Sequence, residues 1–345
     1  MKQVIAMGAL MALLMTTPVF FENAAEIKQS QEAHAMRFNS VKMEYGDKIN
    51  SIDINNLYTV DTAISDVVND PVFGDYGRLI FPVNTGGCSG KTLGELRLIW
   101  YSNIDPNETV AITNYMKEHA ASGDTIFYDI YTDEEKAADP AKEDTGLFFF
   151  KGKPGERFAI CNAGGGFAYL AAMQDSFPHA LELSKQGDNA FALIYRPGAQ
   201  TACEDLSRAI QFVFEHREEL QVNTAGYSLW GGSAGARMAA WVGAYGTAAF
   251  GAEAYPKPAA VIMQYTGLSD YSESDPATFV AVGESDGIAD WRVMKRRLDC
   301  MSRLGTETEF HSYPGLSHGF GLGTGTAAEG WLDEAVAFWQ RQLEP

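Results

Sequence analysis

Strand-like and helix-like segments alternate over most of this 345-residue chain, and this alternation limits the fold more than any other feature. Apolar runs rich in β-branched and aromatic residues predict strands at Leu96–Tyr101, Thr125–Tyr131, Leu147–Lys151, Phe158–Asn162, Ala190–Tyr195, Tyr227–Trp230, Ala260–Tyr265, Thr278–Val282 and Glu307–Tyr313. Apolar residues three and four positions apart predict helices at Pro178–Lys185, Cys203–Glu218, Ala234–Tyr245, Trp291–Arg303 and Ala327–Gln342. This order predicts an α/β domain, whose mostly parallel central sheet carries helices on both faces and whose earliest strands, joined by short turns, form an antiparallel edge.

The first residues of the chain have the pattern of an export signal. Lys2 precedes a run from Val4 to Phe21 that contains no charged residue. Residues 1–25 are therefore predicted to be a signal peptide or an N-terminal anchor, with export to the periplasm or the cell exterior expected and a cytoplasmic location as the alternative. An A-x-A cleavage site is missing, so an uncleaved apolar helix stays open. The polar stretch 26–77 is predicted to be an N-terminal extension, and 78–345 to be the main domain.

The net charge of the chain and the positions of its histidines and cysteines argue against several classes of protein. The formal net charge is −19, from 45 acidic and 26 basic residues, which disfavours nucleic acid and membrane surfaces as partners. The six histidines and four cysteines show no metal-ligand spacing, so no metal and no organic cofactor are expected. The segment 86–92 nearly matches a P-loop, but Thr85 stands where its first glycine is required, which argues against nucleotide binding.

A G-x-S-x-G pentapeptide, Gly231–Gly235, lies between the strand Tyr227–Trp230 and the helix that follows. In this setting the serine occupies a sharp, strained turn where neighbouring backbones leave no room for side chains. The turn is expected to raise the Ser233 hydroxyl above the sheet, beside the positive end of the helix. Ser233 is therefore predicted to be a nucleophile.

Three successive glycines, Gly164, Gly165 and Gly166, follow the strand Phe158–Asn162. A serine nucleophile creates a tetrahedral oxyanion, and each preorganised donor to it is worth about 3 kcal/mol. The N–H groups of Gly165 and Gly166, together with that of Ala234, are predicted to form an oxyanion hole.

A base and an orienting acid are expected after the serine. His318 lies in a loop just beyond the last predicted strand, whereas His311 lies inside that strand, so His318 is predicted to be the base. Asp286 follows the strand Thr278–Val282 and is predicted to be the acid, with Gly287 letting the chain turn away. Asp290, which fits a helix N-cap, and Glu284 stay open as alternatives.

Taken together, the glycine triplet, the serine turn, Asp286 and Ser317-His318-Gly319-Phe320 resemble bacterial α/β-hydrolase esterases, in particular the hormone-sensitive-lipase-like and the acetyl- and feruloyl-esterase-like groups. The resemblance covers Phe158 to the C-terminus. It implies the α/β-hydrolase fold, a Ser233–His318–Asp286 triad and an oxyanion hole at Gly165, Gly166 and Ala234. Such families begin the glycine motif with His or Pro, where this chain has Asn162-Ala163.

The resemblance implies a serine esterase that hydrolyses short-acyl carboxylic esters, including acetyl esters of carbohydrates, through an acyl-enzyme. The interval between Ser233 and Asp286 leaves little room for a large lid. Phe167 and Tyr169 are expected to line the substrate pocket, and Cys161 to pack behind the glycine loop without a catalytic role. A prolyl-oligopeptidase-type peptidase, a lipase and a non-catalytic binding protein on the same scaffold stay open as alternatives.

Overall fold

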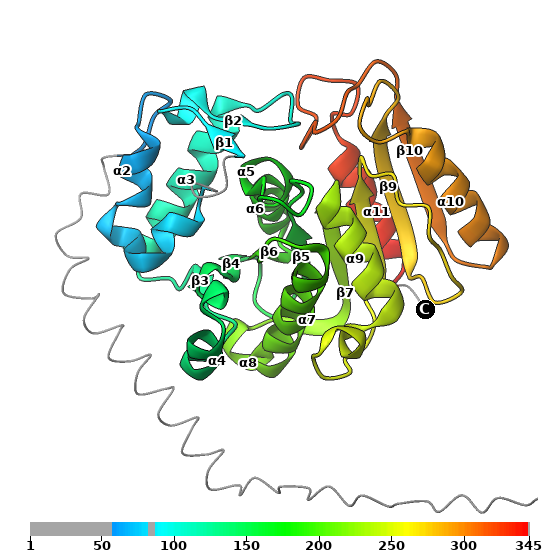
Figure 1. Cartoon of the computed structure of the whole chain (residues 1–345), viewed down its shortest axis with the longest axis horizontal. Helices are drawn as coiled ribbons and strands as arrows, with labels where there is room; N and C mark the ends of the chain where they lie inside the picture. Colours follow the sequence, from blue (N-terminus) through cyan, green and yellow to red (C-terminus); the bar gives the residue numbers. More distant parts are fainter. Residues whose placement is uncertain (1–56, 82–86, 344–345) are drawn as a thin grey trace, which may run out of the picture. The chain divides into compact units, whose positions relative to one another are not determined.

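An eight-stranded sheet forms the centre of the structure, a computed structural model that describes residues 57–81 and 87–343. Its strand order is β10-β9-β8-β7-β5-β6-β4-β3 (Figure 1). The strands are β3 (Phe127–Tyr128), β4 (Gly146–Phe150), β5 (Arg157–Asn162), β6 (Asn189–Ile194), β7 (Asn223–Gly232), β8 (Ala260–Gln264), β9 (Ala277–Gly283) and β10 (Thr308–Tyr313). All pairs from β10 to β6 are parallel, whereas β4 and β3 form an antiparallel edge. The mostly parallel sheet predicted from the sequence is confirmed.

Burial explains why these segments are strands. Every residue of β4, β6 and β8 is buried, as expected for strands covered on both faces, whose sequences are continuous apolar runs. Aromatic rings fill the space between neighbouring strands: Phe149 stacks on Phe191 at a centroid distance of 4.5 Å, and Phe158 stacks on Tyr227 at 5.0 Å. In the edge strand β10, by contrast, every residue is only partly buried.

Helices cover both faces of the sheet. The helices are α2 (Ile64–Val68), α3 (Pro106–Ala121), α4 (Asp133–Ala138), α5 (Ala172–Asp175), α6 (Phe177–Gln186), α7 (Ala199–Glu215), α8 (Arg217–Leu220), α9 (Ala234–Tyr245), α10 (Trp291–Arg303) and α11 (Trp331–Arg341). On one face α9 packs on β5, β7 and β8 and also against α7 (Figure 1). On the other, α6 and α11 meet where His179 contacts Trp331 at a ring distance of 5.5 Å. The predicted bounds of α9 and α10 are confirmed.

The prediction for the chain between the N-terminal extension and β4 is wrong in two respects. The segment Leu96–Tyr101, expected in the antiparallel edge, contributes β2 (Arg97–Leu98), which pairs with β1 (Cys88–Ser89) in a separate two-stranded sheet. The next connection is the 16-residue helix α3 instead of a short turn. Asp105 caps this helix by accepting from Asn107 N–H at 2.8 Å, and Pro106 occupies its first position, a start signal that the sequence does contain.

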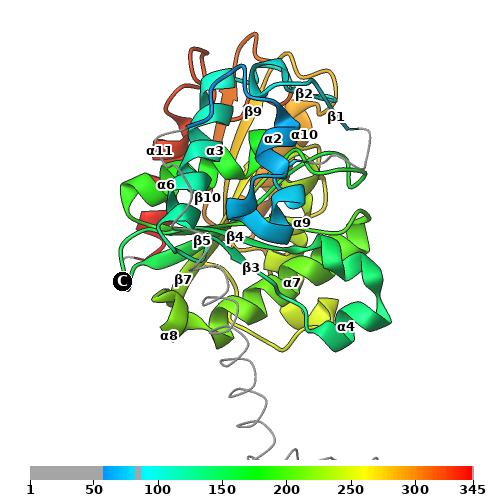
Figure 2. The same ribbon diagram turned by 90° about the vertical axis from the view of Figure 1, so that its left-hand side faces the viewer.

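The predicted domain boundary at residue 78 lies inside a 3₁₀ helix, η1 (Pro71–Leu79), which packs on α3. Val72 and Phe73 of this helix are buried in the same apolar core as the sheet. Figure 2 shows α2 and α3 facing the viewer. The predicted signal peptide or anchor, 1–25, lies outside the described residues, as do residues 26–56 of the extension. Within 57–81 and 87–343, no helix combines the length and apolar character needed to cross a bilayer.

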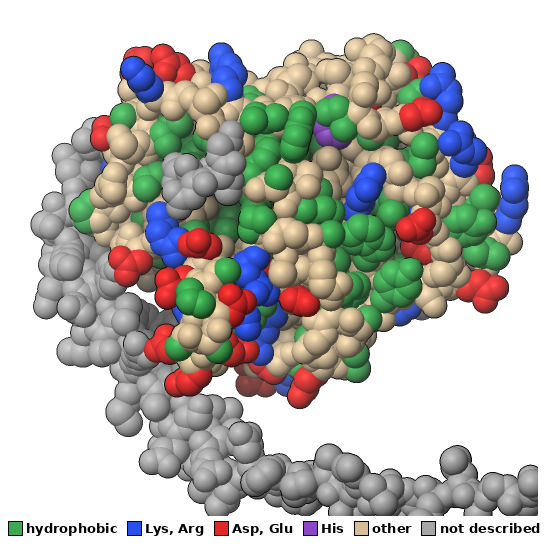
Figure 3. Space-filling model, in the orientation of Figure 1, with side chains coloured by type: hydrophobic (Ala, Val, Ile, Leu, Met, Phe, Trp, Pro, Cys, Tyr) green, Lys and Arg blue, Asp and Glu red, His purple; other side chains and the backbone are tan. Residues whose placement is uncertain are grey.

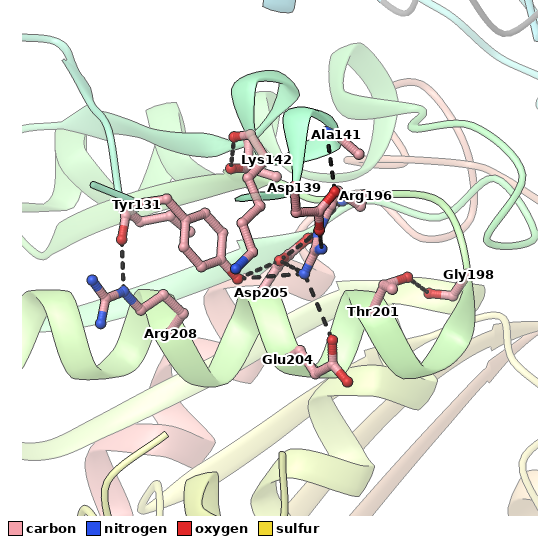
Figure 4. Close-up of polar contacts among 12 residues, drawn as sticks. Tyr131, Asp139, Ala141, Lys142, Arg196, Gly198, Thr201, Glu204, Asp205 and Arg208 are labelled. Carbon is pink, nitrogen blue, oxygen red and sulfur yellow. Dashed lines mark hydrogen bonds and ion pairs between the residues drawn. The ribbon is translucent and has the colours of Figure 1, made fainter. Parts of the chain in front are cut away.

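An ion-pair cluster centred on the buried pair Arg196 and Asp205 fixes the end of β6 to α7 (Figure 4). The Arg196 guanidinium donates to both carboxylate oxygens of Asp205, whose side chain is fully buried, and also to Asp139 at 2.5 Å. Tyr131 donates its hydroxyl to Asp205 at 2.6 Å, and Glu204 lies 3.6 Å from the same guanidinium. Because a buried charge without a partner would be costly, this closed set of pairs gives the cluster a structural role.

Candidate active site

Ser233 occupies a strained turn between β7 and α9, as predicted. Its φ of 52° and ψ of −114° lie in a region that non-glycine residues seldom adopt. A Cβ on Gly231 would come within 2.3 Å of the Gly235 backbone, and a Cβ on Gly235 within 2.1 Å of Asn162 O. The glycines on either side of Ser233 are therefore required by close backbone contacts between β5, β7 and α9.

We expect Gly235→Ala to lower the free energy of unfolding by about 3 kcal/mol, because the new methyl group would overlap a backbone carbonyl that cannot move alone. Denaturant unfolding measures the loss. Gly287→Ala is the control, because no neighbouring atom lies within 4 Å of a Cβ added to Gly287 and its φ is not positive. The prediction that the turn after Asp286 requires glycine at this position is therefore wrong. Equal unfolding midpoints for the two variants would contradict the close-packing argument.

Ser233, His318 and Asp286 form one hydrogen-bonded chain. The His318 Nε2 atom lies 3.2 Å from Ser233 Oγ, and its Nδ1 atom lies 2.7 Å from Asp286 Oδ2. The Asp286 side chain is fully buried, and its other oxygen accepts the N–H groups of Ile288 and Ala289 at 2.8 Å each. The carboxylate is thus fixed in place and can hold the imidazole in the tautomer that leaves Nε2 free to accept a proton from Ser233.

The alternative acids and the alternative base are engaged elsewhere. Asp290 is exposed and caps α10 by accepting from Arg292 N–H at 3.0 Å. Glu284 accepts the hydroxyl of Ser312 at 2.8 Å. His311 lies 2.7 Å from Glu309 and stacks on Phe279. None of the three contacts Ser233 or His318.

The glycine loop lies beside the serine turn because β5 and β7 are adjacent parallel strands. Gly165 and Gly166 have φ values of 119° and 65°, which glycine adopts freely, and their N–H groups donate to no other described residue. The N–H of Ala234 is the first of α9, where helix geometry provides no acceptor. The three predicted oxyanion donors thus have no acceptor among the described residues, and they lie just beyond the carboxyl ends of the parallel strands β5 and β7.

Other residues support the glycine loop where related motifs have His or Pro. Asn162 Nδ2 donates to Trp230 O at 2.8 Å, and the Tyr195 hydroxyl donates to Ala163 O at 2.6 Å. Gly164 N–H donates to Asp175 Oδ2 at 2.9 Å. Sequence reasoning missed Tyr195 and Asp175, because neither belongs to a local motif.

The segment Trp100–Ser102, which follows β2, crosses the site and was also missed. Trp100 has a φ of 72°, is 51% exposed, and its ring lies 3.0 Å from where a Cβ on Gly166 would be. Tyr101 donates its hydroxyl to Asp175 Oδ2 at 2.6 Å, and Ser102 Oγ donates to His318 O at 2.8 Å. This segment therefore contacts both the glycine loop and the histidine loop.

The two residues expected to line the substrate pocket differ in exposure. Phe167, with a φ of 58°, is half-buried and stacks on Trp241 at 6.1 Å. Tyr169 is only 2% exposed; its hydroxyl donates to Ile99 O and its ring lies 5.9 Å from that of Trp100. The buried Tyr169 ring thus packs against the exposed Trp100.

Cys161 is fully buried, and burial raises the pKa of its thiol far above the usual range, which keeps it unreactive.

Comparison with known proteins defines the class of fold. No protein-family model and no curated protein sequence matches the chain. Among solved structures, it is similar to a propionate-bound thermophilic esterase from Thermogutta terrifontis, with 21% identity, a TM-score of 0.51 and coverage of 57% of this chain and 89% of that one. It is also similar to an acetyl ester-xyloside bifunctional hydrolase from Caldicellulosiruptor lactoaceticus, with 19% identity, a TM-score of 0.56 and coverage of 62% and 95%. The chain has the α/β-hydrolase fold.

Proposed function

We propose that this protein is a serine esterase that hydrolyses short-acyl carboxylic esters through an acyl-enzyme. The observation that carries the proposal is the hydrogen-bonded chain from Asp286 Oδ2 through His318 to Ser233 Oγ, at 2.7 and 3.2 Å. The unpaired N–H groups of Gly165, Gly166 and Ala234 beside it supply what acyl transfer requires next, a preorganised site for an oxyanion.

In the first half-reaction, Ser233 Oγ attacks the ester carbonyl carbon while His318 Nε2 takes the hydroxyl proton. Asp286 stabilises the imidazolium that forms, and the oxyanion accepts from the loop N–H groups. The C–O bond to the alcohol then breaks as His318 returns the proton to the leaving oxygen. In the second half-reaction water attacks the acyl-enzyme with the same base, which releases the acid and restores Ser233.

The proposed acyl group is small. Ser233 and Asp286 are joined by α9, η4 (Thr247–Phe250), β8 and β9, and the connections between these elements contain no further helix or strand, so no lid domain is inserted between them. The similar structures carry the words propionate and acetyl ester in their names, which favours the same class of acyl group here. For the alcohol we propose a carbohydrate or another small hydroxylated molecule.

Hydrolysis of p-nitrophenyl esters tests the proposal. We expect turnover of the acetate and propionate esters, with kcat/KM falling by more than tenfold for the octanoate ester. Absence of turnover for every chain length, together with no labelling of the protein by a fluorophosphonate, would refute an esterase and favour a binding protein on this scaffold.

We also expect Trp100 to contact the alcohol part of the substrate. Large apolar side chains that are 49–58% exposed, namely Ile99, Trp100 and Ile288, come from the two segments that flank the triad. Figure 3 shows hydrophobic side chains on both sides of a histidine in the upper part of the view. An indole held over Gly166 presents a flat apolar surface of the kind that sugar and aryl rings stack on.

Trp100→Ala should therefore raise KM about tenfold for an acetylated sugar while changing kcat little, because stacking of this size is worth about 1–1.5 kcal/mol in both ground and transition states. The control substrate is ethyl acetate, whose alcohol is too small to reach the indole and whose KM should stay the same. A kcat loss without a change in KM would contradict this role.

A further inference from the structure

A buried carboxylate, Asp175, lies between the glycine loop and the serine turn. It is 2% exposed and ends the short helix α5. A Cβ added to Gly164 would come within 2.7 Å of Asp175 Oδ2, and a Cβ added to Gly232 would come within 2.7 Å of the same carboxyl group. The residue before the oxyanion donors and the residue before the nucleophile thus both pack directly on this carboxyl group.

All the hydrogen bonds that Asp175 accepts through its side chain come from the walls of the site. Oδ2 accepts the Gly164 N–H at 2.9 Å and the Tyr101 hydroxyl at 2.6 Å, and Oδ1 accepts the Tyr265 hydroxyl at 2.5 Å. The rings of Tyr101 and Tyr265 lie 6.0 and 5.0 Å from the ring of His318. One carboxylate therefore connects the oxyanion loop with two aromatic rings that contact the base.

Three different parts of the chain meet at this carboxylate. Tyr101 comes from the segment after β2, whereas Tyr265 follows β8 and has a φ of 31°. Ser102, next to Tyr101, also donates to the His318 carbonyl. Through Tyr101, Asp175 thus holds the N-terminal segment that crosses the site, in addition to the glycine loop.

The charge of Asp175 works against the stability of the fold. Among the described residues no Lys or Arg pairs with Asp175, and its donors are Tyr101, Tyr265 and Gly164. The other titratable groups that interact with its charge are His318, Tyr169 and Tyr195. Burial raises the pKa of the carboxyl group to about 6, although these donors and His318 oppose the rise. The folded protein therefore binds the proton more tightly than the unfolded chain, so stability decreases as pH rises from about 4 to 6 and the cost persists above that range.

We propose that Asp175 is a positioning residue, which holds the Gly164–Gly166 loop and the tyrosines beside His318 in the geometry of the transition state. The proposal rests on the esterase function proposed above. A carboxylate that only filled space would be better replaced by an amide, since an uncharged side chain of the same shape avoids the cost of the buried charge. Its retention is explained if two oxygens must orient three donors at once.

Asp175→Asn tests this role, because asparagine keeps the volume but replaces one acceptor oxygen by an NH₂ group. For p-nitrophenyl acetate we expect kcat to fall about 100-fold, comparable to the loss of an oxyanion donor, with KM within threefold of wild type. The melting temperature at pH 7.5 should be unchanged or higher, since the variant carries no buried charge. Tyr265→Phe, which removes one donor, should lower kcat about tenfold in the same way.

Asp188→Asn is the matched control. Asp188 is also a buried carboxylate with a raised pKa, but it precedes β6 and pairs with Arg157, at the opposite end of the strands from Ser233. Its kcat should stay within threefold of wild type. If the wild type is active and kcat is unchanged in Asp175→Asn and Tyr265→Phe, the positioning role of Asp175 is overturned while the esterase function stands. Equal losses of kcat in Asp175→Asn and Asp188→Asn would have the same meaning. An inactive wild type would refute the proposed function, and the inference with it.

Discussion

Replacing Ser233 by alanine is expected to lower kcat for p-nitrophenyl acetate by a factor on the order of 10⁶, because alanine leaves no atom that can attack the carbonyl carbon. The oxyanion donors remain, so a small residual rate over water should persist. The fold should be retained, since within 57–81 and 87–343 the hydroxyl of Ser233 hydrogen-bonds to His318 alone.

The control for this variant is Ser269→Ala. Ser269 is an exposed serine outside the site, and its removal should leave kcat within twofold of wild type. Both proteins should show the same circular dichroism. Full activity in Ser233→Ala would mean that a different group performs the hydrolysis.

Asp286→Asn is expected to lower kcat by about 10⁴, with little effect on KM. An asparagine can turn its NH₂ group towards His318 Nδ1 and so stabilise the tautomer whose Nε2 carries the proton. That tautomer cannot take the proton of Ser233. The effect should therefore appear in kcat and in kcat/KM alike.

The two neighbouring acids provide controls of matched chemistry. Asp290→Asn keeps an oxygen that can cap α10, so it should change stability by less than about 0.5 kcal/mol and leave kcat within threefold. Glu284→Gln should be silent, because Glu284 contacts Ser312 on the surface. A loss of 10⁴ in either control, with Asp286→Asn active, would show that the acid has been assigned to the wrong residue.

The second half of the fold could be predicted from sequence because its signals are local. β8 and β9 are continuous apolar runs that end at polar residues, and α9 and α10 were predicted to the residue. The N-terminal part was predicted less well. Arg97–Leu98 belongs to a two-residue strand outside the main sheet, and a short apolar run does not reveal which sheet it joins.

The residues of the site also differ in whether a local sequence pattern reveals them. Ser233 and the glycines could be found because a sharp turn imposes its residue types over five consecutive positions. Asp175 could not, because its partners Tyr101 and Tyr265 are 74 and 90 residues away. An aspartate in an apolar helical segment has no local pattern that separates it from a solvent-exposed one. Such residues are identified only when the strands and loops are placed in space.

The most direct test of Ser233 as the nucleophile is labelling with a fluorophosphonate, followed by mass spectrometry of tryptic peptides. We expect one adduct per chain, in the peptide 218–237, with fragmentation placing it on Ser233 and not on the buried Ser228. Ser233→Ala should take up no label and His318→Ala should label at least 100-fold more slowly. Labelling of any other residue, or equal labelling of wild type and Ser233→Ala, would contradict the assignment of Ser233 as the nucleophile.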